Sequence, residues 1–177
     1  MRREIVTTTK KTKGSSRVKK LYIKQKVFSI GEKFTVYDAQ ERPQYHVQGS
    51  FMQLPKSFRI LNKHDDEIAV ITKKIFSWLP TFYVDIRNQP QIIINKELTF
   101  LKAKYHISAK GIEVEGNWWD MDFQVLRKGR PIADINKRWF TFGDTYEVTI
   151  LDEAYEEMII SLVIAIDCVK NDQQDYS

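Results

Sequence analysis

The sequence predicts a mainly β protein, an antiparallel sandwich or closed barrel of about ten to twelve strands that encloses one apolar C-terminal helix. Three observations carry this prediction. Apolar and polar residues alternate in many short runs, and turn-forming residues separate these runs at fairly regular spacing. Residues 158–166 (MIISLVIAI) are continuously apolar except for Ser161. Such a stretch has to be buried inside the fold.

Period-two alternation marks strands that have one buried side and one solvent-facing side. Turn signals such as Asn88-Gln89-Pro90 and Lys128-Gly129-Arg130-Pro131 lie between the runs and favour hairpins. No helical pattern of 10–15 residues separates the strands, which argues against a parallel α/β fold. The residues expected to face the core are Leu21, Ile23 and Val27; Phe34 and Val36; Tyr45 and Val47; Phe82, Val84 and Ile86; Ile112 and Val114; Tyr146, Val148 and Ile150.

Residues 153–170 (EAYEEMIISLVIAIDCVK) break this alternation and predict a helix. The polar residues in its first half are spaced by three and four, Asp152 can cap its start, and its early glutamates and late Lys170 suit the helix dipole. Its β-branched content favours strand, but less strongly. The apolar part is shorter than the roughly 20 residues of a membrane-spanning helix. We therefore expect a core helix of about 27 Å, with these central residues: Met158, Ile160, Leu162, Val163, Ile166 and Asp167.

The composition indicates a single folded domain. The chain has 177 residues, of which 42% are hydrophobic and 12% aromatic, enough for a substantial core. The single cysteine, Cys168, excludes an intramolecular disulfide and fits a reducing compartment. No apolar segment of signal-peptide length follows the N-terminal charges. We expect a cytoplasmic protein, or one that is peripheral at the inner membrane surface.

The positive charge is concentrated at the N-terminus. The net charge is +5, but residues 1–20 hold eight basic residues and one acidic residue, a net +7, which leaves −2 for the remaining 157. This Thr/Lys/Ser-rich stretch predicts a flexible basic arm ahead of one domain at residues 21–177. One interpretation is that this stretch is only an extended start of the chain or a remnant of cloning. The other is that it is an arm that contacts anionic partners through Lys10, Lys11 and Lys13. The acidic body argues against nucleic-acid binding.

Four segments together resemble a known family: residues 21–34 (LYIKQKVFSIGEKF), 73–80 (KKIFSWLP), 144–148 (DTYEV) and 162–167 (LVIAID). In this order they resemble the LURP-one-related family, over about residues 21–170. That family is similar to the tubby C-terminal domain and to phospholipid scramblases. The resemblance implies a tubby-like closed antiparallel barrel of about twelve strands around a hydrophobic C-terminal helix. Related activities are phosphoinositide binding in tubby proteins and the calcium-triggered lipid scrambling claimed for scramblases, but a shared fold does not transfer function.

No residue constellation supports catalysis or a metal site. The segment before the final helix has one carboxylate, Asp144, whereas calcium requires six to eight oxygen ligands. The three histidines are scattered and have no cysteine beside them. Asp120 and Asp122 read as surface carboxylates, and no nucleophile or nucleotide motif occurs. Asp167 lies inside the apolar stretch, where a buried carboxylate is costly unless it is paired or sits near the helix end. Arg138 is a candidate for this ion pair. We expect no enzyme, no cofactor and no metal.

The aromatic residues near lysines suggest a membrane surface. Trp78 follows Lys73 and Lys74 in a predicted loop or strand end, where an apolar tip could reach lipid headgroups. The competing interpretation is that Trp78 and the other tryptophans pack in the core or at the barrel rim. The leading hypothesis is a non-enzymatic barrel that binds anionic phospholipid headgroups. The alternative is a protein-interaction or structural barrel without a lipid role; a ligand inside the barrel is disfavoured because the helix fills it.

Overall fold

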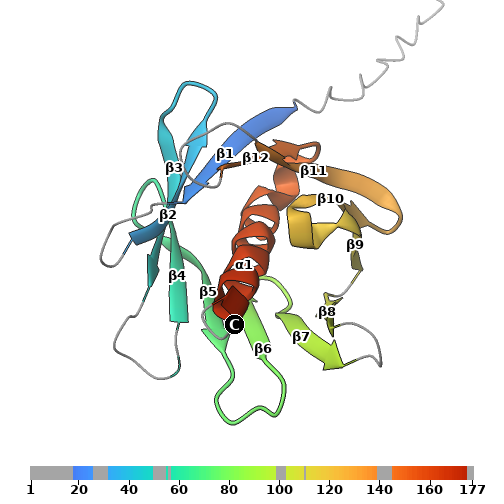
Figure 1. Cartoon of the computed structure of the whole chain (residues 1–177). Coiled ribbons are helices and arrows are strands. Elements are labelled where there is room, and N and C mark those ends of the chain that lie inside the picture. Colours follow the sequence, from blue (N-terminus) through green and yellow to red (C-terminus); the bar gives the residue numbers. More distant parts are fainter. Residues whose placement is uncertain are drawn as a thin grey trace, which may run out of the picture.

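The chain folds into a nearly closed antiparallel β-barrel that surrounds one C-terminal helix (Figure 1). This is a computed structural model, and it describes residues 18–25, 32–49, 55, 57–98, 103–109, 111–138 and 145–174. Twelve strands form one sheet, as the alternation and the family resemblance predict. The fold class read from the sequence is therefore confirmed.

Strands β1 to β8 form one meander and β9 to β12 another, and the pairing of β1 with β12 joins the two into one sheet. The order around the barrel is β8-β7-β6-β5-β4-β3-β2-β1-β12-β11-β10-β9, so β8 and β9 lie at its two ends. The strands are β1 (Lys19–Gln25), β2 (Glu32–Asp38), β3 (Pro43–Gly49), β4 (Ser57–Asn62), β5 (Glu67–Lys73), β6 (Thr81–Ile86), β7 (Ile92–Leu98), β8 (Ala103–Ser108), β9 (Ile112–Asn117), β10 (Asp122–Arg127), β11 (Arg130–Arg138) and β12 (Thr145–Ile150).

The strand alternation places apolar side chains inside the barrel and polar side chains outside. Leu21 and Ile23 of β1 are buried, and so are Val148 and Ile150 of β12. Ile112 and Val114 of β9 are only half-buried, although they pack against the core. Val27 lies outside the described residues. The structure also includes Lys19 and Lys20 in β1, two residues that the charge count had assigned to the basic arm.

The core helix begins with a short 3-10 turn. Asp152 caps this turn, η2 (Glu153–Tyr155), by accepting a hydrogen bond from the Ala154 backbone N–H at 3.1 Å. The α-helix α1 then runs over Glu156–Gln174, four residues beyond the predicted end. Every residue from Met158 to Val169 is at most 5% exposed. Ser161, the polar residue among them, donates its hydroxyl to the Glu157 carbonyl at 2.7 Å, so its burial leaves no unmet hydrogen bond.

Asp167 is satisfied from the barrel wall, not by Arg138. The Tyr146 hydroxyl donates to Oδ1 of Asp167 at 2.5 Å, and both residues are buried. The predicted pairing with Arg138 is wrong because Arg138 binds Glu147 on the outer surface. Tyr146 and Glu147 are consecutive in β12 and therefore face opposite sides of the sheet. Helix and wall are thus joined by a buried hydrogen bond in addition to apolar packing.

The antiparallel order gives the barrel two distinct ends. Lys19 of β1 pairs in register with Ile150 of β12, and its ammonium lies 2.7 Å from the carboxylate of Glu156, where α1 begins. We call this the helix-entry end. Odd-numbered strands run away from it, so β1, β5 and β11 finish at the opposite end, towards which α1 also runs (Figure 1). We call that the helix-exit end. Among the described residues, no helix is long and apolar enough to cross a bilayer.

Candidate functional site

The loop between β5 and β6 concentrates exposed apolar side chains at the helix-exit end. We call residues 74–80 the apolar loop. Phe76 is 101% exposed, Trp78 94% and Ile75 41%. In the part of the chain that the structure describes, the only other exposed large hydrophobic residue is Val18. Because most large apolar side chains among the described residues are buried, three exposed ones in one short loop need an explanation.

The apolar loop is held in shape at its base. The Lys74 backbone N–H donates to the Thr81 carbonyl at 2.8 Å, just beyond the pairing of Lys73 with Phe82. The buried Thr81 hydroxyl donates to the Leu79 carbonyl at 3.3 Å. The aromatic tip therefore stands on a hydrogen-bonded hairpin base.

Phe76 adopts a backbone conformation that bulky residues avoid. Its φ is 56°, in the left-handed region that favours glycine, and a non-glycine residue there costs of the order of 1 kcal/mol. The Phe76 side chain is fully exposed, so no apolar burial offsets this cost. The fold alone thus gains nothing from a phenylalanine at this position.

The predicted lipid-binding residues fall into two groups. Lys73 and Lys74 lie at the start of the apolar loop and Trp78 within it, so the structure brings these three together. Lys10, Lys11 and Lys13 lie outside the described residues. Ile75 and Phe76 were not among the predicted lipid-binding residues, although the apolar run between Lys74 and Pro80 was the signal for them. Trp118 instead packs against the core, as the competing interpretation expects of tryptophans.

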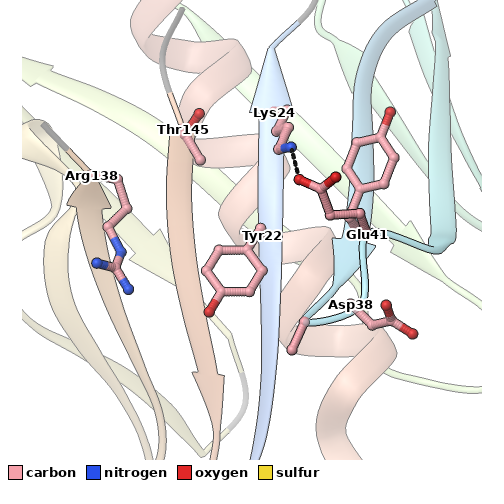
Figure 2. A pocket seen from close by; sticks show the side chains of 8 residues that line it. Tyr22, Lys24, Asp38, Glu41, Arg138 and Thr145 are labelled. Atoms are coloured by element: carbon pink, nitrogen blue, oxygen red, sulfur yellow. Dashed lines mark hydrogen bonds and ion pairs between the residues drawn. The ribbon is translucent and has the colours of Figure 1, made fainter. Parts of the chain in front are cut away.

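A second feature is a pocket on the outer wall, over β1, β2, β11 and β12 (Figure 2). Its volume is about 360 Å³. Figure 2 shows Tyr22 between Arg138 on one side and the Lys24–Glu41 pair on the other. The Lys24 ammonium lies 3.2 Å from Glu41 and 5.0 Å from the centre of the Tyr37 ring. We call this the outer-wall pocket; its lining residues are Tyr22, Lys24, Tyr37, Asp38, Ala39, Glu41, Arg138 and Thr145.

Beside the pocket, two cations share one carboxylate. Glu147 accepts a hydrogen bond from Lys20 at 2.7 Å and another from Arg138. Burial pushes the pKa of Glu147 upward, but the hydrogen bonds from Lys20 and Arg138 outweigh it and hold the pKa below its usual value. The hydrogen bond with Glu147 raises the pKa of Arg138. The cluster therefore keeps an excess positive charge at neutral pH.

Asp38 is committed to the turn that follows β2. Its carboxylate accepts from the backbone N–H groups of Gln40 and Arg42 at 2.9 and 3.0 Å, and from the Arg42 guanidinium at 2.7 Å. Burial opposes ionisation, but these hydrogen bonds lower its pKa. Asp38 thus stays ionised in the wall of the pocket. Its negative charge is offset by the Arg42 guanidinium and by the backbone N–H groups of the turn.

Glu147 gives the fold a specific acid sensitivity. Because its pKa is lowered in the folded state, its ion pairs stabilise the fold above the usual carboxyl value of 4.5, and this stability is lost as the pH falls through the lowered pKa. We expect Glu147→Gln to be less stable than wild type at pH 6, with the difference shrinking toward pH 3. Urea unfolding across this range measures it. A difference independent of pH would contradict the assignment.

The described residues contain no group of three or more His, Cys, Asp or Glu side chains that could hold a metal ion. His46 pairs with Asp65 at 3.3 Å. Asp120 lies in the 3-10 turn η1 (Trp118–Asp120), where its backbone N–H donates to the Asn117 side chain, and both Asp120 and Asp122 are exposed. Asp144 lies outside the described residues.

Comparison with known proteins agrees with the resemblance. A family model described as LURP-one-related matches residues 19–167. The uncharacterized protein YxjI of Bacillus subtilis (strain 168) is 30% identical over 160 residues, which span 89% of this chain and 97% of that protein. An X-ray structure of a protein from Arabidopsis thaliana matches with a TM-score of 0.56 at 12% identity, over 87% of this chain and 93% of that chain, and supports the fold alone. The chain therefore belongs to the LURP-one-related family.

Proposed function

We propose that this protein is a non-enzymatic barrel that binds anionic phospholipid headgroups and docks on the membrane through the apolar loop. The observation that carries the proposal is the full exposure of Phe76 and Trp78 in one loop at one end of the barrel. Lys73 and Lys74 stand at the start of the same loop. In an anionic membrane surface, the apolar tip would reach the acyl chains, and the basic residues behind it would lie among the negatively charged headgroups.

The expected energies are those of a reversible peripheral contact. Burying an aromatic side chain of this size contributes about 1.5–3 kcal/mol, and each lysine near an anionic surface adds about 1 kcal/mol. Two aromatic residues and two lysines therefore give binding that dilution or salt reverses. The loop base is preorganised by the Lys74–Thr81 hydrogen bond, so little ordering entropy opposes docking.

The test is flotation of the full-length protein with phosphatidylcholine vesicles, with and without phosphatidylserine, at low and high salt. We expect binding that needs phosphatidylserine and weakens with salt. Lys73→Gln with Lys74→Gln should lower the partition coefficient about thirty-fold, because about 2 kcal/mol of attraction is removed. The matched control is Lys63→Gln with Lys128→Gln, two exposed lysines in turns at the helix-entry end.

Three results would separate the proposal from its rivals. Absence of binding to phosphatidylserine vesicles at low salt would contradict it and leave the protein-interaction barrel. If the Lys63 and Lys128 control variant lost as much vesicle binding, the overall positive charge of the protein, and not the apolar loop, would account for the binding. A variant that lacks residues 1–17 tests the basic arm, and the truncation has to stop before Lys19 because β1 begins there. Binding lost only in that variant would move the site from the barrel to the arm.

A further inference from the structure

We propose that the outer-wall pocket binds a phosphate group, held between Lys24 and Arg138. The phosphate site itself does not depend on the apolar loop, because other strands and other side chains line it. The phosphate could be carried by a small soluble molecule or by a lipid headgroup, and the chemistry of recognition is the same for both.

The sheet register brings the two cations to the same level of the wall. Lys24 of β1 and Arg138 of β11 both pair with Thr145 of β12, so the three residues form one row across three adjacent strands. At the usual strand spacing, the Cα atoms of Lys24 and Arg138 lie about 10 Å apart. Both side chains are long, and all three residues line the pocket. A phosphate a few ångströms across can therefore contact both.

The nearest competitor for Lys24 is easily displaced. The Glu41 side chain is 81% exposed, and its contact with Lys24 is a single 3.2 Å ion pair. Exposed pairs of this kind contribute little stability. The Glu41 carboxylate thus occupies the place beside the Lys24 ammonium that a ligand oxygen would take. An anion with more charge than one carboxylate would displace it.

Arg138 keeps donors available for a ligand. Its guanidinium has five N–H donors, of which an Nη2 donor binds Glu147. Its side chain is 52% exposed. Because Lys20 also neutralises Glu147, the Arg138 charge is only partly cancelled. Arginine forks recognise phosphate oxygens in pairs.

Phosphate fits this arrangement better than a carboxylate does. Its oxygens project in several directions, so one group can reach both cations, whereas a planar carboxylate presents two oxygens on one edge. The Tyr22 and Tyr37 rings, which are paired neighbours on β1 and β2, offer a surface for the body of the ligand. The volume of about 360 Å³ falls in the range of small-molecule sites. The pocket thus suits a small phosphomonoester.

The row of Lys24, Thr145 and Arg138 also lies near the helix-exit end, where β1 and β11 finish and β12 begins. The apolar loop is at this same end. A lipid at a docked membrane would therefore present its phosphate on the same side as this row, and this part of the inference rests on the proposed membrane docking. A soluble phosphomonoester does not depend on it.

The test is a titration of the full-length protein with glycerol 3-phosphate at low salt, followed by NMR or calorimetry, with glycerol as the phosphate-free control. We expect saturable binding to glycerol 3-phosphate only. Arg138→Gln and Lys24→Gln should each weaken it about tenfold, and the surface control Arg130→Gln should not. Glu41→Gln should strengthen binding more than Glu113→Gln, a gain that unfolding cannot produce.

Vesicles of phosphatidylcholine with phosphatidic acid distinguish the two sources. If only these vesicles bind, if Arg138→Gln and Lys24→Gln reduce that binding, and if Glu41→Gln strengthens it, the ligand is a lipid phosphate. Saturable binding to glycerol 3-phosphate, together with vesicle binding that Arg138→Gln and Lys24→Gln leave unchanged, would identify a soluble ligand. The inference is overturned if neither probe binds, if glycerol binds equally well, or if the Arg138 and Lys24 variants match the Arg130 control.

Discussion

Replacing Ile160 with aspartate is expected to unfold the barrel. Ile160 is fully buried in the middle of α1, among apolar side chains of the surrounding strands. An aspartate there removes a large apolar side chain and buries an unpaired carboxylate, which together cost several kcal/mol. A domain of this size has about 5–15 kcal/mol of stability in total. Far-UV circular dichroism and urea unfolding would show the loss of the cooperative transition, and Leu162→Asp should behave alike.

The control for this prediction is Val18→Asp, which places the same charge on a residue that is 59% exposed. It should leave the unfolding midpoint nearly unchanged. A cooperatively folded Ile160→Asp protein would contradict the assignment of α1 as the core of the barrel. So would a folded protein that lacks residues 153–177, because the twelve strands would then need no helix to pack against.

The alternation in the sequence was sufficient to assign the inward side of the strands. Residues such as Phe34 and Val84 occur at period two in short runs, and the structure buries them. This worked because one face of each strand meets α1 and the other meets solvent, so the pattern is not blurred by a second layer of protein. The weaker burial of Ile112 and Val114 falls at β9, an end of the strand order, where fewer neighbours cover them.

The helix boundaries were harder to predict. Asp152 is a cap signal, and the structure confirms it, but the turn after it is a 3-10 turn, so α1 begins at Glu156. Lys170 suited a helix end because of the dipole, yet the four residues that follow it contain no glycine or proline to stop the helix. A capping residue such as Asp152 marks where this helix starts, whereas no residue after Lys170 marks where it ends, and helix ends are uncertain by one or two residues in any case.

The two candidate sites differ in how far the sequence could reveal them. The apolar loop is contiguous, so the mixture of lysines and aromatics in residues 73–80 was visible directly. The outer-wall pocket joins Tyr22 and Lys24 to Arg138 and Thr145, more than a hundred residues later. Their proximity depends on the pairing of β1 with β12, a long-range register that local patterns do not specify.

Replacing Phe76 with glycine and Trp78 with serine is expected to have the largest effect on membrane binding. If each aromatic side chain contributes about 1.5–3 kcal/mol on insertion, the pair accounts for a hundredfold or more in the partition coefficient. Thermal stability should not fall, because both side chains are exposed in the folded protein. Glycine also relieves the left-handed backbone at position 76, where φ is 56°. Flotation and thermal unfolding on the same samples measure both quantities.

The unequal effect on binding and stability is what distinguishes a docking loop from a structural one. If Phe76 and Trp78 served the fold, the double variant would lower the unfolding midpoint along with binding. The conservative pair Phe76→Leu and Trp78→Phe should retain most of the binding, because it keeps apolar volume at the tip. Salt separates the loop's two contributions: the aromatic variant should keep the wild-type salt dependence at a lower level, whereas the Lys73 and Lys74 variant should flatten it. A vesicle affinity unchanged by the aromatic variant would instead assign these side chains to a protein partner.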